Sequence, residues 1–171
     1  MFNFYRRRKI RRNRTRTRSR RIRKSAQHKS NHPDYLANKT AAHRIIIERL
    51  EHFAAEYTRL DPTYVAVMKY RRVSIRNQRS RWGSCSAQKN LNFNYRLVHL
   101  SPELRDYVIV HELCHLVELN HGRAFWSLVE KMIPNAHALS HTIRRMPMDK
   151  VAGAVAVQRD ALPMRSQNPV L

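Results

Sequence analysis

The stretch VIVHELCHLVELNHGRAFW (Val108–Trp126) places three histidines and two glutamates in an apolar frame. His111 and His115 are four residues apart, so on a helix their rings lie on one face and can reach a single metal ion. Glu112 lies beside them without having to bind the ion, which is the position that a general base requires. The stretch therefore predicts a buried helix with a catalytic zinc site.

A catalytic zinc needs three protein ligands and one open position, and His121 is the leading candidate for the third ligand. If the helix continued, His121 would be rotated by about 120° from the ligand face and displaced by about 9 Å along the axis. We therefore expect the helix to end first. Asn120 and Gly122 tolerate left-handed backbone conformations, so the turn is expected around them.

Two other third ligands stay open at this stage. Cys85 would give a Cys-His-His site like that of peptide deformylases, and Glu130 would give a carboxylate site of the thermolysin type. Glu118 is expected beside the site or in solvent, rather than on the metal. The second histidine pair with a spacing of four, His137 and His141, has no adjacent glutamate and is expected on an exposed helical face. The remaining residues of the stretch that we expect in the core are Cys114, Phe125 and Trp126.

Charge is unevenly distributed along the chain of 171 residues, whose formal net charge is +22. Residues 1–31 hold 14 of the 34 Lys and Arg residues and no Asp or Glu. Such a segment is expected to be disordered, and its charge favours nucleic-acid binding through phosphate neutralisation, with a solvated tail or a targeting segment as the alternatives. We therefore divide the chain into an Arg-rich arm (1–31), one folded domain (32–148) that contains the predicted zinc site, and a tail (149–171). The candidate nucleic-acid contacts in the arm are Arg6, Arg7, Arg8, Arg11, Arg12, Arg20 and Arg21.

The order of predicted elements is a helix, then strands, then helices. Apolar spacing predicts a helix over 34–60, and β-branched residues predict one or two strands over 64–76. Short strands and turns follow around Gly83, and Ser101-Pro102 supplies a helix N-terminus. Further helices are expected over 123–132 and 136–146. This order indicates an α+β fold in which a small antiparallel sheet packs against the active-site helix and flanking helices.

Neither a secretory signal nor a run of about 18 apolar residues is visible, so no membrane span is predicted. The two cysteines are too few for a disulfide scaffold. We expect a soluble, cytoplasmic protein.

Several motifs together resemble one known family. RWGSCS (81–86), LNFNYRL (91–97), DYVIVHELCHL (106–116), His121 and the pair Phe125-Trp126 are similar to the YgjP-like metallopeptidase-domain family, whose distant relatives include the SprT-like proteases. The resemblance covers about residues 35–145 and leaves the Arg-rich arm outside the pattern.

The resemblance implies a compact zincin-like fold with one Zn²⁺ per chain, ligated by His111, His115 and His121, and with Glu112 as catalytic base. It also implies that RWGSCS forms an edge strand beside the cleft. Metzincins have a glycine at the position of Glu118, so membership of that group is not expected. The candidate cleft residues are Arg81, Trp82, Gly83 and Ser84.

The sequence thus favours a zinc metallohydrolase that cleaves peptide bonds with zinc-activated water, with recruitment to nucleic acid by its arm as an additional property. Candidate oxyanion donors are Arg81, Tyr95 and His99. One alternative is a deformylase-like amide hydrolase. Another is a nucleic-acid-binding protein with a structural zinc, whose basic track would include Lys69, Arg71, Arg72, Arg76, Arg79 and Arg81, with Tyr70 and Trp82 for stacking. Glu112 favours the hydrolase, because a structural site needs no carboxylate beside an open position.

Overall fold

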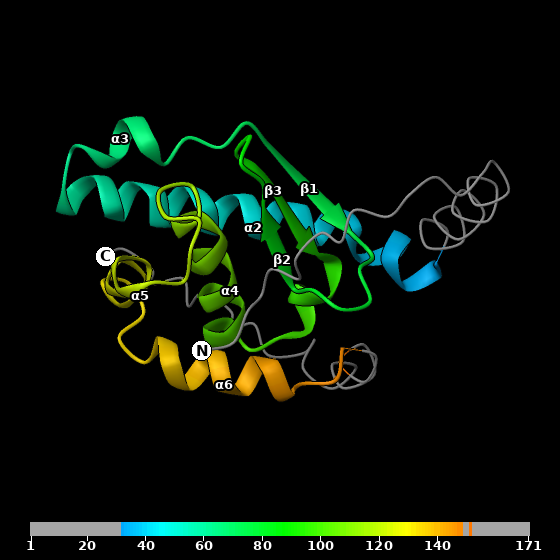
Figure 1. Cartoon of the computed structure of the whole chain (residues 1–171). Helices are drawn as coiled ribbons and strands as arrows, with labels where there is room; N and C mark the ends of the chain where they lie inside the picture. The colour runs from blue at the N-terminus through cyan, green and yellow to red at the C-terminus, as the bar shows by residue number, and fades with distance from the viewer. Residues whose placement is uncertain (1–31, 149–150, 152–171) are drawn as a thin grey trace, which may run out of the picture.

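A computed structural model describes residues 32–148 and residue 151 of the chain (Figure 1). The predicted α+β class is confirmed. The arm at 1–31 and, apart from Val151, the tail lie outside the described residues. The elements are α2 (Pro33–Leu60), α3 (Tyr64–Val67), β1 (Arg72–Arg76), β2 (Gly83–Cys85), β3 (Asn90–Asn94), the 3-10 helix η1 (Tyr95–His99), α4 (Pro102–Cys114), α5 (Arg123–Glu130) and α6 (Ala136–Arg145).

Helix α2 is the long support of the fold, and its range agrees with the predicted helix at 34–60. Tyr35 is buried near its start, and from Ala42 on its buried residues recur at intervals of three and four and form a single apolar stripe. This stripe packs against the sheet and α4, and α2 runs behind both of them in Figure 1. The buried residues of the stripe are Ala42, Ile46, Leu50, Phe53 and Tyr57.

The three-stranded sheet has the order β1-β3-β2. Strand β2 pairs with β3 antiparallel, but β1 pairs with β3 parallel, so the predicted purely antiparallel sheet is wrong and the sheet is mixed. The cause is the connection through residues 77–82, which carries the chain past β3 before a tight turn at Lys89 (φ 58°) returns it between the other two strands. Residue alternation predicts the faces of a strand, but not the direction of its partner.

The segment Tyr64–Val67 is a short helix, whereas a strand was predicted there. The backbone N–H of Thr63 donates to Oδ1 of Asp61 (2.9 Å), and the N–H of Tyr64 donates to the carbonyl of Asp61 (3.1 Å). These bonds start a turn at Asp61-Pro62 that continues as a helix. Local capping therefore overrides the β propensity of Val65 and Val67.

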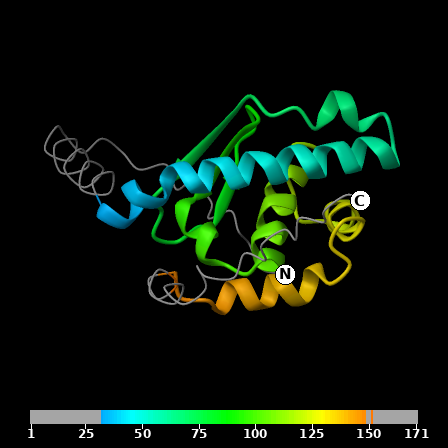
Figure 2. The ribbon, with the colours of Figure 1, turned by 180° about the vertical axis from the view of Figure 1, so that it is seen from behind.

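Helix α4 lies at the centre of the fold. The hydroxyl of Ser101 caps it by accepting from the N–H of Leu104 (3.4 Å), as the sequence predicts. Arg49 of α2 binds Asp106 of α4 through two hydrogen bonds of 2.8 and 2.9 Å. Helices α5 and α6 also pack on α4, and α5 is joined to α2 by a hydrogen bond from the Tyr57 hydroxyl to the carbonyl of Leu128 (2.8 Å) (Figure 2). The centre of α4 is therefore enclosed by the other elements. Its buried residues are Leu104, Tyr107, Val108, Ile109, Val110, Glu112, Leu113 and Cys114.

A helix that crosses a bilayer must be both long and apolar. No helix within residues 32–148 meets both requirements.

Candidate metal centre and cleft

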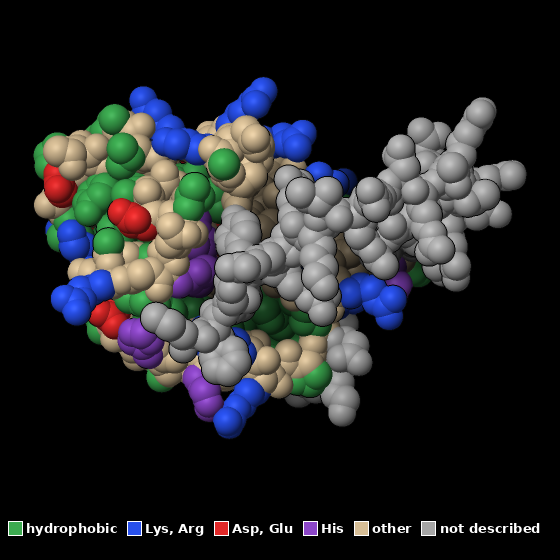
Figure 3. Space-filling view, viewed as in Figure 1, with side chains coloured by type: hydrophobic (Ala, Val, Ile, Leu, Met, Phe, Trp, Pro, Cys, Tyr) green, Lys and Arg blue, Asp and Glu red, His purple; other side chains and the backbone are tan. Residues whose placement is uncertain are grey.

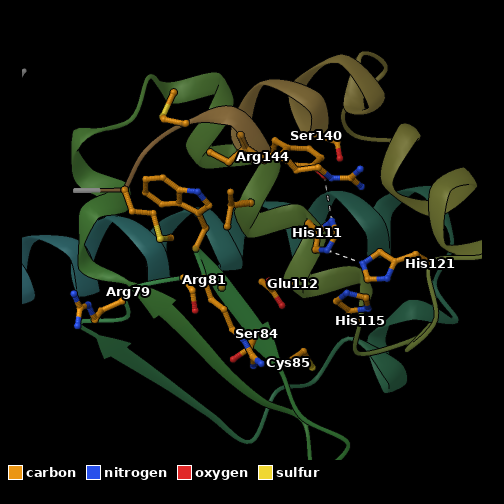
Figure 4. A pocket seen from close by; sticks show the side chains of 18 of the residues that line it. Arg79, Arg81, Ser84, Cys85, His111, Glu112, His115, His121, Ser140 and Arg144 are labelled. Atoms are coloured by element: carbon orange, nitrogen blue, oxygen red, sulfur yellow. Dashed lines mark hydrogen bonds between the residues drawn. The ribbon is translucent and has the colours of Figure 1, made fainter. Parts of the chain in front are cut away.

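Three histidines converge at the end of α4. His111 lies in the last turn of the helix, His115 is its C-terminal cap, and His121 comes from the following loop. One ring nitrogen from each lies within 4.8 Å of the others. Figure 4 shows the three rings turned toward one another beside Glu112. The arrangement presents three imidazole nitrogens to one point in space.

Because α4 ends at Cys114, His121 does not continue along the helix. The N–H of Glu118 donates to the carbonyl of Cys114 (2.9 Å), and the N–H of Gly122 donates to the carbonyl of Asn120 (2.8 Å). The second bond closes a three-residue turn centred on His121. The turn is where the sequence predicts it, but it does not use the left-handed conformation that Asn120 and Gly122 tolerate: among residues 32–148 only Lys89 has positive φ, and Gly122 has φ −80°. The two backbone hydrogen bonds form this turn, and it does not depend on the conformational range of glycine.

The protonation of the rings suits metal binding. Nδ1 of His115 donates to the carbonyl oxygen of Glu118 (2.8 Å), since a carbonyl can only accept, and its Nε2 is left with a free lone pair. Nε2 of His111 and Nε2 of His121 face each other at 3.0 Å. Ligand nitrogens on a tetrahedral zinc lie about 3.3 Å apart at bond lengths of about 2.0–2.1 Å, so the spacing of His111 and His121 is close to that of two ligands on one ion.

Burial favours the neutral form of all three histidines. It lowers the pKa of His111 well below its usual value, and the neighbouring histidines and Arg144 lower it further. Burial also lowers the pKa of His115, and it lowers that of His121 to about 4. Neutral imidazole is the form that binds a metal ion. The cluster is therefore set up as a ligand set near neutral pH.

Aromatic rings from α5 hold the cluster in place. Phe125 is buried and stacks on His115, with ring centroids 4.6 Å apart. It also contacts the rings of His111 (4.9 Å) and His121 (4.7 Å) edge-on. Phe125 thus forms the apolar floor under all three histidines, in agreement with its predicted core position.

Glu112 is buried, with 6% of its surface exposed, and it lies between the histidines and strand β2. Burial raises its pKa to about 8, although the positive charge of Arg81 and a hydrogen bond from the backbone N–H of Cys85 act in the opposite direction. Its Oε2 atom has no hydrogen-bond partner among the described residues. One carboxylate oxygen is therefore available to an incoming group.

Gly83 leaves room for Glu112. A Cβ atom at position 83 would lie 2.5 Å from Cγ and 2.6 Å from Oε1 of Glu112. Both distances are far below van der Waals contact. Strand β2 and the Glu112 side chain therefore fit together only because residue 83 has no side chain.

The histidines and Glu112 open into a cleft of about 830 Å³. The four residues predicted for the cleft, Arg81, Trp82, Gly83 and Ser84, all line it. The buried side chain of Asn94 fixes the loop before them, since its Nδ2 donates to the carbonyls of Gln78 (2.8 Å) and Arg81 (3.0 Å).

Helix α6 contributes three cleft residues that the sequence analysis missed, Ser140, Ile143 and Arg144. Tyr107 was also missed as a site residue; its hydroxyl lies 3.4 Å from Nδ1 of His111. Tyr107 is one turn before His111 on α4, and this spacing was a usable signal. Nothing local in the sequence connects Arg144 with the histidines, because α6 reaches the site only through packing.

Other residues singled out in the sequence lie elsewhere. Tyr95 is fully buried and its hydroxyl donates to Asp34 (2.6 Å), so neither it nor His99 lines the cleft. Cys85 lines the cleft without joining the histidine cluster. Glu130 lies 3.2 Å from His137, which is exposed as predicted, as is His141. The arm residues Arg6, Arg7, Arg8, Arg11, Arg12, Arg20 and Arg21 lie outside the described residues.

The match to one family model agrees with a metal centre. The family model described as YgjP-like, metallopeptidase domain, matches residues 5–146, and thus includes most of the arm. Among solved structures, the crystal structure of the metallopeptidase zymogen of Pyrococcus abyssi abylysin is similar at 24% identity and a TM-score of 0.46, over 57% of this chain and 90% of that chain. This likeness is too weak to carry an argument. No curated protein sequence matches the chain.

Proposed function

Because the chain belongs to the YgjP-like metallopeptidase family, we propose that it is a zinc-dependent peptidase with its active site at the end of α4. The observation that carries the proposal is the convergence of three imidazole nitrogens beside one buried carboxylate. His111, His115 and His121 would hold one Zn²⁺. No fourth histidine, cysteine or carboxylate of the described residues joins this group, so one position would stay open, as in catalytic zinc sites.

Bound zinc supplies Lewis acidity toward the scissile carbonyl and lowers the pKa of a coordinated water to about 7. The charge of a cation held by the three histidines would lower the pKa of Glu112 and keep it ionised despite its burial. Glu112 then takes a proton from the attacking water at Oε2, the oxygen without a partner among the described residues, and delivers it to the leaving amine. The N–H of Cys85 and the absence of a side chain at Gly83 keep the carboxylate in this position. Of the predicted oxyanion donors, Arg81 is retained, because it lines the cleft.

Strand β2 is an edge strand with no further strand paired to it among the described residues, and this edge offers a place for an extended peptide. Ser84 pairs with Asn92 of β3, and the flanking bonds run from Asn94 N–H to the Trp82 carbonyl and from Ser86 N–H to the Asn90 carbonyl. In an antiparallel pair with these bonds, Gly83 directs its backbone groups to the opposite, unpaired edge. That edge borders the cleft, so a substrate strand paired with Gly83 would pass the histidines.

The test of this function is zinc content by elemental mass spectrometry together with hydrolysis of a mixture of peptides. We expect about one zinc per chain, as in mononuclear catalytic sites, and new amino termini in the peptide products. Cleavage should stop after removal of the metal with a chelator and return when zinc is added. A chain that takes up no zinc, or cleaves equally well without it, would contradict the proposal.

Gly83→Ala is expected to reduce turnover without loss of zinc. The new Cβ must displace Glu112, and a displacement of about 1 Å in a catalytic group costs about 100-fold in rate. We expect kcat/KM to fall by about 10–100-fold. Steady-state hydrolysis of one cleaved peptide and zinc content measured on the same preparation check this.

Gly122→Ala is the matched control for this variant. Nothing lies within 4 Å of a Cβ at position 122 and its φ is −80°, so alanine should leave both turnover and zinc content unchanged. Glu112→Asp, made with and without Gly83→Ala, supplies a second control. The aspartate side chain is one methylene shorter than glutamate, so it leaves space for the Cβ atom of an alanine at position 83. If Gly83→Ala costs as much in the Glu112→Asp background as in the native one, the contact with Glu112 is not the cause.

We also propose that the Arg-rich arm recruits the peptidase to nucleic acid. The support is the charge of residues 1–31, with 14 Lys and Arg and no acidic residue. Binding of this kind neutralises phosphates, carries little sequence information and weakens steeply with salt.

A further inference from the structure

The positive charge of the described domain is concentrated in one contiguous segment. Residues 62–102, which contain the whole sheet, have eight Lys and Arg residues and no Asp or Glu. The other residues from 32 to 148 have nine Lys and Arg and ten Asp and Glu, so they are close to neutral. The excess charge of the domain therefore belongs to the sheet and its connections. The eight basic residues are Lys69, Arg71, Arg72, Arg76, Arg79, Arg81, Lys89 and Arg96.

These charges are not neutralised locally. None of the eight takes part in a salt bridge within the described residues. Six of them, Lys69, Arg71, Arg72, Arg76, Arg79 and Arg81, are exposed. In Figure 3, Lys and Arg side chains gather over the upper part of the sheet region, whereas the Asp and Glu side chains in that view lie on the left.

The two faces of the sheet differ in chemistry. Ile75, Leu91 and Phe93 point to one face and are buried, where α2 and α4 lie. Side chains alternate along a strand, so the other face presents Arg72, Ser74 and Arg76 of β1. The register places Asn90 beside Arg72, and Asn92 beside both Ser74 and Ser84. The hydrogen bond from Nδ2 of Asn92 to Oγ of Ser84 (3.4 Å) shows that these two side chains share this face.

No described helix packs on this second face, although the loop that contains Gln78 and Arg81 covers it at the buried Asn94. We call the remaining part the polar sheet face and define it as Arg72, Ser74, Arg76, Ser84, Asn90 and Asn92. A sheet face without apolar residues contributes nothing to a hydrophobic core. Arginines bind phosphate oxygens through charge and paired N–H donors, and Ser and Asn side chains donate to the same oxygens.

We propose that the polar sheet face binds the phosphodiester backbone of nucleic acid, separately from the arm. The face has no aromatic side chain on which a base could stack, so binding is to the backbone and independent of sequence. It also has no apolar side chain to insert into a bilayer, which favours nucleic acid over an anionic lipid surface. Ser84 belongs to the polar sheet face and also lines the cleft, so bound nucleic acid would lie next to the cleft entrance.

The test compares two double variants of the full chain that remove the same charge. Arg72→Gln with Arg76→Gln changes the polar sheet face. Arg44→Gln with Arg123→Gln removes two exposed arginines of α2 and α5 and serves as control. Both variants keep the arm. Affinity for a 20-base-pair DNA duplex is measured by fluorescence anisotropy over a range of salt concentrations.

Each lost phosphate contact lowers the slope of log K against log salt by about 0.9. We therefore expect the face variant to lose about 2 in slope and to bind about 10–100-fold more weakly at 0.1 M salt, while the control stays close to the native chain. Equal losses in both variants would overturn the proposal, since binding would then follow total charge. Binding to phosphatidylserine vesicles is measured in parallel. A face variant that binds DNA as tightly as the native chain but has lost binding to the vesicles would also overturn the proposal.

Circular dichroism and zinc content must match the native chain in both variants. Hydrolysis of a short peptide should also be unchanged, because Arg72 and Arg76 lie outside the cleft. Failure of DNA binding to respond to the face variant would thus leave the peptidase proposal untouched. A chain without peptidase activity could still show the difference between the two variants.

Discussion

Replacement of Glu112 by glutamine is expected to lower kcat for peptide hydrolysis by about 10²–10⁴-fold, the usual contribution of a general base. The amide has the shape of the carboxylate but cannot accept a proton from the attacking water. Its oxygen can still accept the hydrogen bond from the N–H of Cys85, so the side chain should keep its place. Zinc content should therefore stay at the native level. Steady-state kinetics and elemental analysis of the same sample measure both quantities.

Glu118→Gln is the matched control for this variant. Glu118 is close to the cluster in sequence, but it contacts His115 through its backbone carbonyl, which the substitution leaves intact. Turnover should change by less than about 2-fold, as for surface changes away from the chemistry. Retained hydrolysis in Glu112→Gln would remove Glu112 from the mechanism. Loss of zinc in Glu112→Gln would instead assign the carboxylate to the integrity of the metal site.

The helices of this chain were predictable because their signals are local. The apolar stripe of α2 and the Ser101-Pro102 start of α4 each specify an element within a few residues. The strand predicted over 64–76 was correct only in its second half. The hydrogen bonds to Asp61 start a turn, and the residues after it form helix α3 instead of a strand. The parallel pairing of β1 with β3 depends on a crossover between distant residues, which no local pattern encodes.

The candidate site also contains some features that local sequence specifies and others that depend on tertiary packing. The spacing of His111, Glu112 and His115 on one helix specifies their relative placement before any tertiary contact is known. The prediction of His121 as the third ligand required only that helix α4 end before residue 121. The contact between Gly83 and Glu112 joins β2 to α4, and the approach of Arg144 joins α6 to α4, so both appear only after the elements pack. The sequence predicts Gly83 as a turn residue, although the structure needs it for space.

Removal of the His121 imidazole tests which residue is the third zinc ligand, since the sequence leaves His121, Cys85 and Glu130 as candidates. His121→Ala is expected to release the zinc, because only two histidines remain and their neutral nitrogens no longer enclose the ion. The loss in affinity should exceed the roughly 10–100-fold that follows loss of an outer hydrogen-bond partner of a ligand. Peptide hydrolysis should fall to background. His121 lies in a loop after α4, so circular dichroism should show an intact fold.

His141→Ala is the matched control, because His141 is an exposed histidine of α6 outside the cluster, and its replacement should leave zinc and turnover unchanged. Cys85→Ser tests the Cys-His-His alternative. If His121→Ala kept its zinc and Cys85→Ser lost it, the site would be of the deformylase type. Burial raises the pKa of Cys85 to about 11, so the metal would then have to lower it to bind a thiolate. The structure leads us to expect the reverse, since the nitrogens of His111 and His121 already face each other at 3.0 Å while Cys85 stands outside the cluster.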